Sequence, residues 1–165
     1  MAPREETTRM RVKDICRRDV KACGPEETLA QAAAAMWTFD CGILPVVDDD
    51  RRLLGVLTDR DICMAVATRD QRASRLLARE VLTVDPAVCG PDEPLADALA
   101  RMERHQVRRL PVVDADGVLR GMLSICDVLR QEGLEPQALR TLRAICEPRG
   151  LDVEEYGSPA LTLSR

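Results

Sequence analysis

The chain has 165 residues and a formal charge of −4, and its apolar content of 45 % is almost wholly aliphatic because aromatic residues make up only 2 %. This length suits one compact domain or two small, closely packed ones. The single Trp, Tyr and Phe are too few for the aromatic platforms that usually hold single-stranded nucleic acid, and the acidic balance argues against a general polyanion binder. We therefore expect no nucleic acid among the partners.

The first ten residues, MAPREETTRM, are charged and have no apolar stretch like that of a signal peptide. No later apolar run approaches the roughly 18 residues that a membrane span needs. These features predict a flexible N-terminus over residues 1–10 and a cytoplasmic protein with no membrane partner.

Seven cysteines are scattered along the chain without a CxxC pair or a histidine-rich neighbourhood. Their odd number and their spacing fit neither a disulfide framework nor a familiar zinc site. Buried, reduced thiols are the simplest interpretation.

An internal repeat organises the chain. One constant offset brings the sequence onto itself without a gap, as the two matching cysteines Cys23 and Cys89 show (89 − 23 = 66). Residues 23–36, CGPEETLAQAAAAM, lie over residues 89–102, CGPDEPLADALARM, and LPVVDDD at 44–50 lies over LPVVDAD at 110–116. The chain therefore contains two copies of one supersecondary unit.

Each copy contains the same series of predicted elements. A short helix, around 11–16 or 76–81, precedes a short extended stretch at 20–23 or 87–89. A Gly-Pro stop and acidic first-turn residues then open an alanine-rich amphipathic helix that ends near Thr38 or Arg104. Aliphatic runs on both sides of a polar turn predict a β-hairpin, and a second helix starts near Asp59 or Ile125. The unit is β-α-β-β-α, which places the chain in the mixed α/β or α+β class.

After the second copy, the segment PQALRTLRAICE predicts an amphipathic helix with Leu139, Leu142 and Ile145 on one side. We expect this side to pack on the chain's own module or across a dimer. No catalytic domain fits in the remaining length.

The end of each hairpin carries a repeated turn, GVLTDRD at 55–61 and GMLSICD at 121–127. A Ser or Thr followed three residues later by an acid is typical of a helix capping box, and capping alone would explain both turns. It does not explain the shared context, in which a Leu-Pro-Val-Val strand and a glycine precede each turn at a fixed distance. A helix N-terminus can also hold phosphate, and an aspartate one turn in can accept two hydrogen bonds from a ribose.

At these residues the sequence resembles a tandem pair of CBS domains, named for cystathionine β-synthase and often called a Bateman module. The resemblance rests on the duplicated pattern G-h-x-[ST]-x-x-D, where h is apolar, and on the apolar-Pro strand before it; it covers about residues 10–132. It implies a first CBS domain at 11–69, a linker at 70–76, a second CBS domain at 77–132 and a C-terminal helical tail at 133–165. In this fold the two sheets pack face to face with pseudo-twofold symmetry and leave two clefts for adenosine-containing ligands.

The resemblance also assigns ligand-binding residues. Thr58 and Asp61 would contact ribose in one cleft, and Ser124 and Asp127 in the other. The backbone of two matching strand segments would lie along adenine: Ile43, Leu44 and Pro45 in one copy and Arg109, Leu110 and Pro111 in the other. The residues expected to close the base pocket are Lys21, Ala22, Ala87 and Val88.

Three arginines lie within plausible reach of a phosphate, although surface arginines in an acidic protein are more often solvated or paired. They are Arg60, Arg108 and Arg109. Arg60 is the strongest candidate, and its repeat equivalent is Cys126. The second cleft would therefore lack this cation and prefer a nucleoside or bind more weakly.

Two further features resemble metal sites only superficially. The run Asp48, Asp49, Asp50 falls in a hairpin turn, and its counterpart DADG has ordinary turn chemistry, which favours a solvated turn. His105 has no cysteine at ligand spacing, which favours a histidine at the surface or at a cleft edge.

The resemblance implies a regulatory module that binds an adenosine-containing nucleotide of the AMP, ADP or ATP class and signals to a partner protein in trans. A homodimer is expected, and no cofactor beyond such a regulatory nucleotide. Two alternatives remain: a structural or partner-binding module with empty clefts, and a thiol-linked or metal-linked stress sensor. An enzyme is not expected, because no Ser-His-Asp, Cys-His or paired-carboxylate constellation is present in the sequence pattern.

Overall fold

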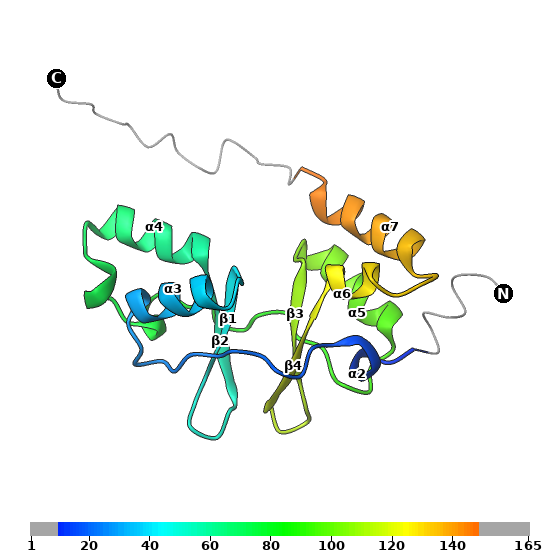
Figure 1. Cartoon of the computed structure of the whole chain (residues 1–165), viewed down its shortest axis with the longest axis horizontal. Coiled ribbons are helices and arrows are strands. Elements are labelled where there is room, and N and C mark those ends of the chain that lie inside the picture. Colours follow the sequence, from blue (N-terminus) through cyan, green and yellow to red (C-terminus); the bar gives the residue numbers. More distant parts are fainter. Residues whose placement is uncertain (1–9, 149–165) are drawn as a thin grey trace.

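The computed structural model describes residues 10–148. It has two lobes whose two-stranded sheets lie next to each other in the middle, with the helices on the outside (Figure 1). The predicted mixed class is confirmed. The expectations for residues 1–9 and for the end of the tail lie outside the described residues.

The elements are α2 (Val12–Ile15), α3 (Leu29–Thr38), β1 (Ile43–Val47), β2 (Leu53–Thr58), α4 (Asp59–Arg69), the 3₁₀ turns η1 (Ala73–Arg75) and η2 (Ala78–Glu80), α5 (Leu95–His105), β3 (Arg109–Val113), β4 (Leu119–Ser124), α6 (Ile125–Leu129) and α7 (Glu135–Cys146).

The first long helix of each lobe begins and ends close to where the sequence predicts. α3 begins at a capping box in which the Thr28 amide donates to Gln31 Oε1 at 2.8 Å and the Gln31 amide donates to Thr28 Oγ1 at 3.3 Å. It buries Leu29, Ala32 and Met36, which helical spacing puts on one face. α5 begins after Pro94 instead and ends at His105.

The two predicted hairpins are confirmed, and they have the same register. β1 pairs antiparallel with β2, from Ile43 opposite Thr58 onward, and β3 pairs in the same way with β4, from Arg109 opposite Ser124 onward. The extended stretches predicted at 20–23 and 87–89 are much shorter than expected. Each forms a single parallel bridge, Cys23 to Val46 and Cys89 to Val112, because the rest of each stretch runs between the lobes.

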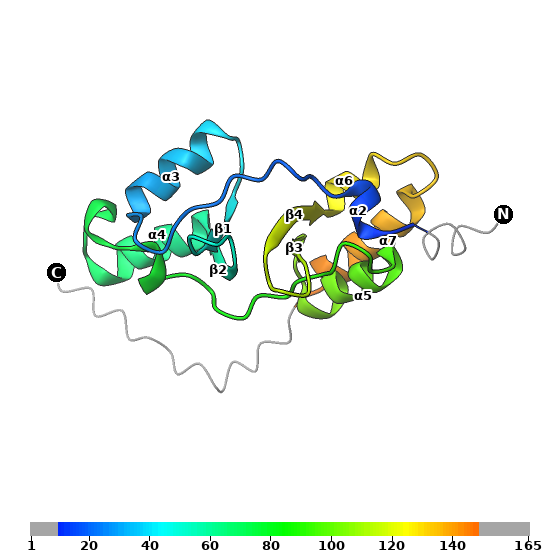
Figure 2. The ribbon, with the colours of Figure 1, turned by 90° about the horizontal axis from the view of Figure 1, so that it is seen from below.

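The segment that precedes each repeat packs in the core of the other repeat. Val12 and Ile15 of α2 pack in the core of the second repeat, whereas Leu76 and Ala78, which precede the second repeat, pack in the core of the first. Figure 2 shows the two connections crossing between the lobes, one from α2 to α3 and the other toward α5. The helix predicted at 76–81 is only the 3₁₀ turn η2, since the chain there is about to cross.

Main-chain hydrogen bonds fix each crossing against the neighbouring sheet. Arg17 exchanges two of them with Met122 of β4, at 3.0 and 2.9 Å. Thr83 exchanges two with Val56 of β2, at 2.8 and 3.1 Å. These residues are repeat equivalents (83 − 17 = 66 and 122 − 56 = 66), so the two crossings obey the predicted pseudo-twofold relation.

The close crossings explain the glycine that precedes each repeated turn. A Cβ atom on Gly55 would lie 2.5 Å from the Thr83 carbonyl oxygen, and one on Gly121 would lie 2.6 Å from the Arg17 carbonyl oxygen. Real Cβ atoms essentially never come this close to other atoms, so only glycine fits where the second backbone passes. The turn ends of the hairpins also meet, since the Leu53 amide donates to the Gly117 carbonyl at 3.0 Å.

The tail contains the helix α7, which packs on α5 and α6 of the second lobe (Figure 1). Its buried face consists of Gln137, Ala138, Thr141 and Ile145. Leu139, which was expected on the side that packs on the module or across a dimer, does not pack on the module: its side chain is 50 % exposed, because the face that meets α5 is turned toward Ala138 and Thr141. None of the helices within residues 10–148 is both long and apolar enough to cross a membrane.

Candidate functional site

Each repeated turn is a complete capping box. The amide of Thr58 donates to Asp61 Oδ2 at 2.9 Å, its hydroxyl donates to the same oxygen at 2.7 Å, and the Asp61 amide donates back to Thr58 Oγ1 at 3.2 Å. Ser124 and Asp127 make the same three bonds at 3.0, 2.5 and 3.1 Å. The capping interpretation is therefore confirmed for both turns, and it occupies only one carboxylate oxygen of each aspartate.

The second carboxylate oxygen distinguishes the two turns. Asp127 Oδ1 accepts hydrogen bonds from Arg17 Nε at 3.1 Å and from Arg130 Nη1 at 3.2 Å. In the part of the chain that the structure describes, no donor reaches Asp61 Oδ1. Asp61 is also partly exposed, whereas Asp127 is buried. The first turn thus keeps a free acceptor and the second does not.

Sequence reasoning missed Arg17 and Arg130. Their repeat equivalents are Thr83 and Met64, neither of which carries a charge (83 − 17 = 66 and 130 − 64 = 66). This asymmetry between aligned positions was the available signal. Arg17 lies 110 residues from Asp127 along the chain, so no local pattern joins them.

The strand residues predicted along adenine lie beside the capped turns, but most of their side chains are unavailable to a ligand. Ile43 stands opposite Thr58, and Arg109 stands opposite Ser124. Leu44 and Leu110 are fully buried in the two cores, so they could meet a ligand only through their backbone. Pro45 and Pro111 are buried too, and their carbonyls accept hydrogen bonds from the amides of Cys23 and Cys89.

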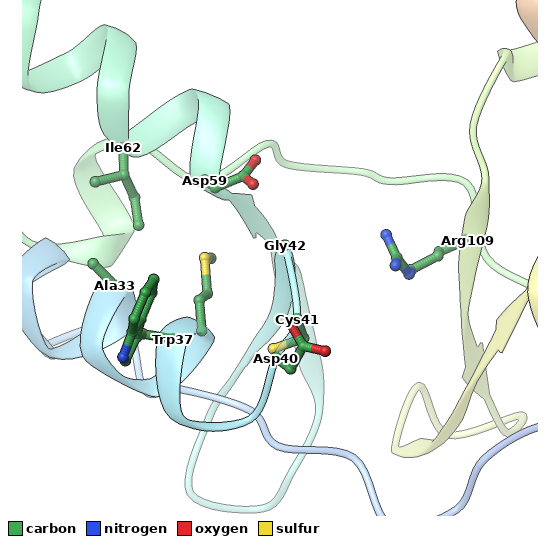
Figure 3. Close-up of a pocket in the computed structure, with 9 residues that line it drawn as sticks. Ala33, Trp37, Asp40, Cys41, Gly42, Asp59, Ile62 and Arg109 are labelled. Atoms are coloured by element: carbon green, nitrogen blue, oxygen red, sulfur yellow. The ribbon is translucent and has the colours of Figure 1, made fainter.

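A cavity of about 510 Å³ opens where the C-terminal end of α3 and the start of β1 meet the N-terminal end of α4. Arg109 extends toward it from β3 of the other repeat, across from Asp59 (Figure 3). This arginine was expected along the adenine of the second cleft, and the structure places its side chain on a cavity of the first lobe. The lining residues are Ala33, Met36, Trp37, Asp40, Cys41, Gly42, Asp59, Ile62 and Arg109.

Most residues of this cavity were not singled out from the sequence. The available signal was Trp37, the only tryptophan, which is 89 % exposed at the end of an otherwise alanine-rich helix. Large aromatic side chains are usually well buried unless they serve an interface or a ligand. The cavity has the size of typical small-molecule sites.

A second cavity, of about 470 Å³, contains two of the predicted base-pocket residues, Ala87 and Val88. Its lining also includes Glu93, Arg101 and His105 but neither Ser124 nor Asp127. Arg101 Nη1 donates to Glu93 Oε2 at 2.9 Å, so the arginine of this cavity is already paired with a carboxylate. The structure therefore places these base-pocket residues on a cavity that the second capped turn does not line.

The corresponding place in the first lobe is arranged differently. The equivalent of His105 is Phe39 (105 − 39 = 66), and the Lys21 ammonium lies 5.6 Å from the centre of the Phe39 ring. This is cation–π geometry, which gives Lys21 a partner other than a ligand. Ala22 is half-buried beside Cys23.

Of the three arginines predicted near phosphate, Arg109 lines the first of the two cavities described above, and neither of these cavities includes Arg60 or Arg108. Arg60 is exposed on the first turn of α4, where its amide donates to Asp59 Oδ1 at 2.7 Å. Arg108 is also exposed, and its carbonyl accepts a hydrogen bond from the Ile125 amide at 3.0 Å.

All seven cysteines are free thiols. Burial is the main reason that the pKa of Cys23 rises to about 11 and that of Cys89 to about 12. Both thiols are therefore protonated and unreactive near neutral pH. Within residues 10–148, no three His, Cys, Asp or Glu side chains gather in an arrangement that could hold a metal ion.

The Asp48 turn has ordinary turn chemistry, as predicted. Asp48 Oδ1 accepts from the amides of Asp50 and Arg52 at 3.0 and 2.7 Å, and Asp49 and Asp50 are exposed. Asp114 has the same role in the other turn, where a hydrogen bond from the Val118 amide is the main cause that lowers its pKa.

Comparison with known proteins gives consistent matches. The family model of the CBS domain matches residues 12–68 and 78–132. Hypoxic response protein 1 of Mycobacterium tuberculosis is 34 % identical over 139 residues, which are 84 % of this chain and 96 % of that protein. Inosine-5′-monophosphate dehydrogenase of the same species is 36 % identical over 115 residues, and the chain spans only 21 % of that enzyme's length.

Two solved structures are similar over most of their length. The crystal structure of Hypoxic Response Protein I with two coordinated zinc ions has a TM-score of 0.68 at 34 % identity, covering 74 % of this chain and 98 % of that one. The CBS domain pair of protein MJ0100, in complex with 5′-methylthioadenosine and S-adenosyl-L-methionine, has a TM-score of 0.66 at 25 % identity, covering 73 % and 94 %.

Proposed function

This chain belongs to the CBS-domain family, and from that premise we propose that it is a regulatory module that binds an adenosine-containing nucleotide of the AMP, ADP or ATP class at its capped turns. One observation carries the proposal. Asp61, one turn into α4, uses one carboxylate oxygen to cap the helix and keeps the other free of hydrogen bonds from residues 10–148, and the residue as a whole is partly exposed. A ribose diol supplies hydroxyl donors of the kind that such an oxygen accepts.

The surroundings of Asp61 supply complementary groups for the rest of a nucleotide. α4 has 11 residues, so its dipole contributes positive potential at the N-terminus, which favours phosphate and is opposed by Asp59 and Asp61 in the first turn. Arg109 faces the adjacent cavity from the other repeat, and Arg60 lies on the first turn of α4. Because Asp40 and Asp59 also line that cavity, a phosphate would bind on its Arg109 side.

The apolar part of the same cavity suits a purine. Met36, Trp37 and Ile62 contribute aliphatic and aromatic surface next to Asp59, the first residue of α4, although Thr58 and Asp61 do not themselves line the cavity. The bound 5′-methylthioadenosine and S-adenosyl-L-methionine of the similar CBS pair support the adenosine class of ligand. They do not select among AMP, ADP and ATP for this chain.

We infer that the module acts in trans, as a homodimer that signals to a partner protein. The support is exposed apolar surface on helices of both lobes: Trp37 is 89 % exposed, and Met64 and Leu139 are each 50 % exposed. The exposed thiols of Cys63, Cys126 and Cys146 fit a reducing compartment such as the cytoplasm. A monomer in light scattering at micromolar concentration would overturn the dimer.

Calorimetric titration with AMP, ADP and ATP tests the ligand proposal. We expect the wild type to bind at least one of them, and Asp61→Ala to weaken that binding about tenfold or more, because a hydrogen bond to a charged group is lost. Thr28→Ala is the matched control, since it removes a cap from α3 in the same repeat without touching the turn. If the wild type bound none of the three and released no adenosine compound on denaturation, the module with empty clefts would be the better account.

A further inference from the structure

Both carboxylate oxygens of Asp127 in the second capped turn accept hydrogen bonds, one from Ser124 of the turn and the other from two arginines outside it. Asp127 Oδ2 accepts from the amide and hydroxyl of Ser124, and Asp127 Oδ1 accepts from Arg17 and Arg130. Four donors therefore converge on a carboxylate that has about four acceptor positions. The Asp127 side chain is only 8 % exposed, whereas both arginine side chains are 63 % exposed.

The first turn has the same backbone but lacks both cations. Thr83 crosses β2 with the same pair of main-chain hydrogen bonds that Arg17 makes with β4, so the two residues occupy equivalent places. Met64, inside α4, is the repeat equivalent of Arg130, which directly follows the last residue of the shorter helix α6, and Met64 is half exposed. The difference between the turns thus arises from two side chains on an otherwise repeated framework.

We propose that Arg17 and Arg130 form a latch over Asp127, so that the chain binds nucleotide at Asp61 and keeps its second site closed until both guanidiniums withdraw. The proposal rests on the proposed function and specifies which of the two sites is available. A ribose that approaches Asp127 must displace two charge-assisted hydrogen bonds, whereas one that approaches Asp61 meets a free oxygen. Arg17 lies on one of the two connections between the lobes, the one from α2 to α3.

The latch is tested by counting sites. AMP, ADP and ATP are titrated separately into the wild type, the double variant Arg17→Gln/Arg130→Gln and the control Arg18→Gln. Arg18 is adjacent and exposed, but its guanidinium donates to the Lys13 carbonyl at 3.4 Å instead of to Asp127. We expect one site in the wild type and in the control, and two sites in the double variant, of which the second is lost when Asp127→Ala is added.

Installing the latch on the first turn gives the converse test. Met64→Arg/Thr83→Arg places guanidiniums at the equivalent positions, and we expect it to weaken binding at Asp61 about tenfold or more, with unchanged thermal unfolding as the sign of an intact fold. Unchanged affinity in this folded variant would contradict the latch. Two equal sites in the wild type, or a single site in the double glutamine variant, would also overturn it while leaving the proposed function standing. If none of these proteins binds any of the three nucleotides, the proposed function itself fails, and the latch with it.

Discussion

In the first repeat the aspartate of the capped turn keeps one oxygen free, whereas in the second repeat the same oxygen accepts from Arg17 and Arg130. The motif residues, the strand register and the crossing backbone are all repeated. The difference comes from Arg17, on the connection between α2 and α3, and from Arg130, which directly follows α6. A duplicated motif therefore shows where two sites lie, but the residues around it decide whether each site is open.

The largest expected effect concerns the segments that precede the two repeats, each of which packs in the core of the other repeat. Ile15→Ala deletes a side chain that is only 9 % exposed in the core of the second repeat, and we expect a loss of about 2 to 4 kcal/mol in the free energy of unfolding. Hydrogen exchange should show the loss of protection in β3 and β4. Leu76→Ala is the corresponding variant for the first repeat, because Leu76 precedes the second repeat and packs in the core of the first; protection should be lost in β1 and β2. Weakening of the repeat nearer in sequence would contradict this packing.

A somewhat smaller effect is expected at the crossing points, where the two repeats should behave alike. Gly55→Ala and Gly121→Ala place a Cβ against the Thr83 and Arg17 carbonyls, and each should cost about 1 to 3 kcal/mol in urea denaturation. Gly90→Ala is the control, because a Cβ there has no atom within 4 Å. Equal stability of all three variants would show that the lobes separate easily.

The capped turns themselves should differ in their contribution to stability. Asp61→Ala should cost about 1 kcal/mol, the typical contribution of a cap. Asp127→Ala should cost about 2 kcal/mol, because two ion pairs are lost as well, although the exposure of both arginines limits each pair to less than about 1 kcal/mol. The excess should shrink in high salt. Equal costs for the two variants in low salt would argue against any contribution from the arginines.

The smallest expected difference between the two repeats is in the reactivity of Cys23 and Cys89, which are equivalent buried thiols. Alkylation of the native protein near pH 8 should modify Cys63, Cys126 and Cys146 and spare Cys23 and Cys89, whose pKa values are raised to about 11 and about 12 by burial. Since the pKa values of Cys23 and Cys89 are raised in the folded state, the contribution of these two thiols to the free energy of unfolding is complete below the ordinary value of 9.0. It is lost as the pH rises toward 11. Mass spectrometry of the alkylated protein, before and after unfolding, measures which thiols are modified. Labelling of Cys23 or Cys89 in the native protein would contradict the prediction.

The fold was largely predictable from the sequence because both copies of the repeat carry the same pattern for each element. The hairpins, the capping boxes and the start of α4 follow from local patterns that need only neighbouring residues. The packing of each preceding segment in the core of the other repeat was not predictable in this way, since nothing near Ile15 indicates that its partners come from the other repeat. The exposure of Leu139 was not predictable either, since helical spacing shows which residues share a face and not which face meets a neighbour.

The candidate site was predictable in part for the same reason. The capping role of Thr58, Asp61, Ser124 and Asp127 was predictable because the turn is local, and their ligand-binding role remains a prediction. The arginines on Asp127 and the approach of Arg109 to the first lobe depend on contacts between distant segments, which only the folded chain brings together.

The most direct test of the account is a crystal structure of the chain grown with AMP. The account predicts the ribose on Asp61, with Arg17 and Arg130 still bonded to Asp127. A nucleotide on Asp127 with Asp61 empty, or equal occupancy of both turns, would contradict it.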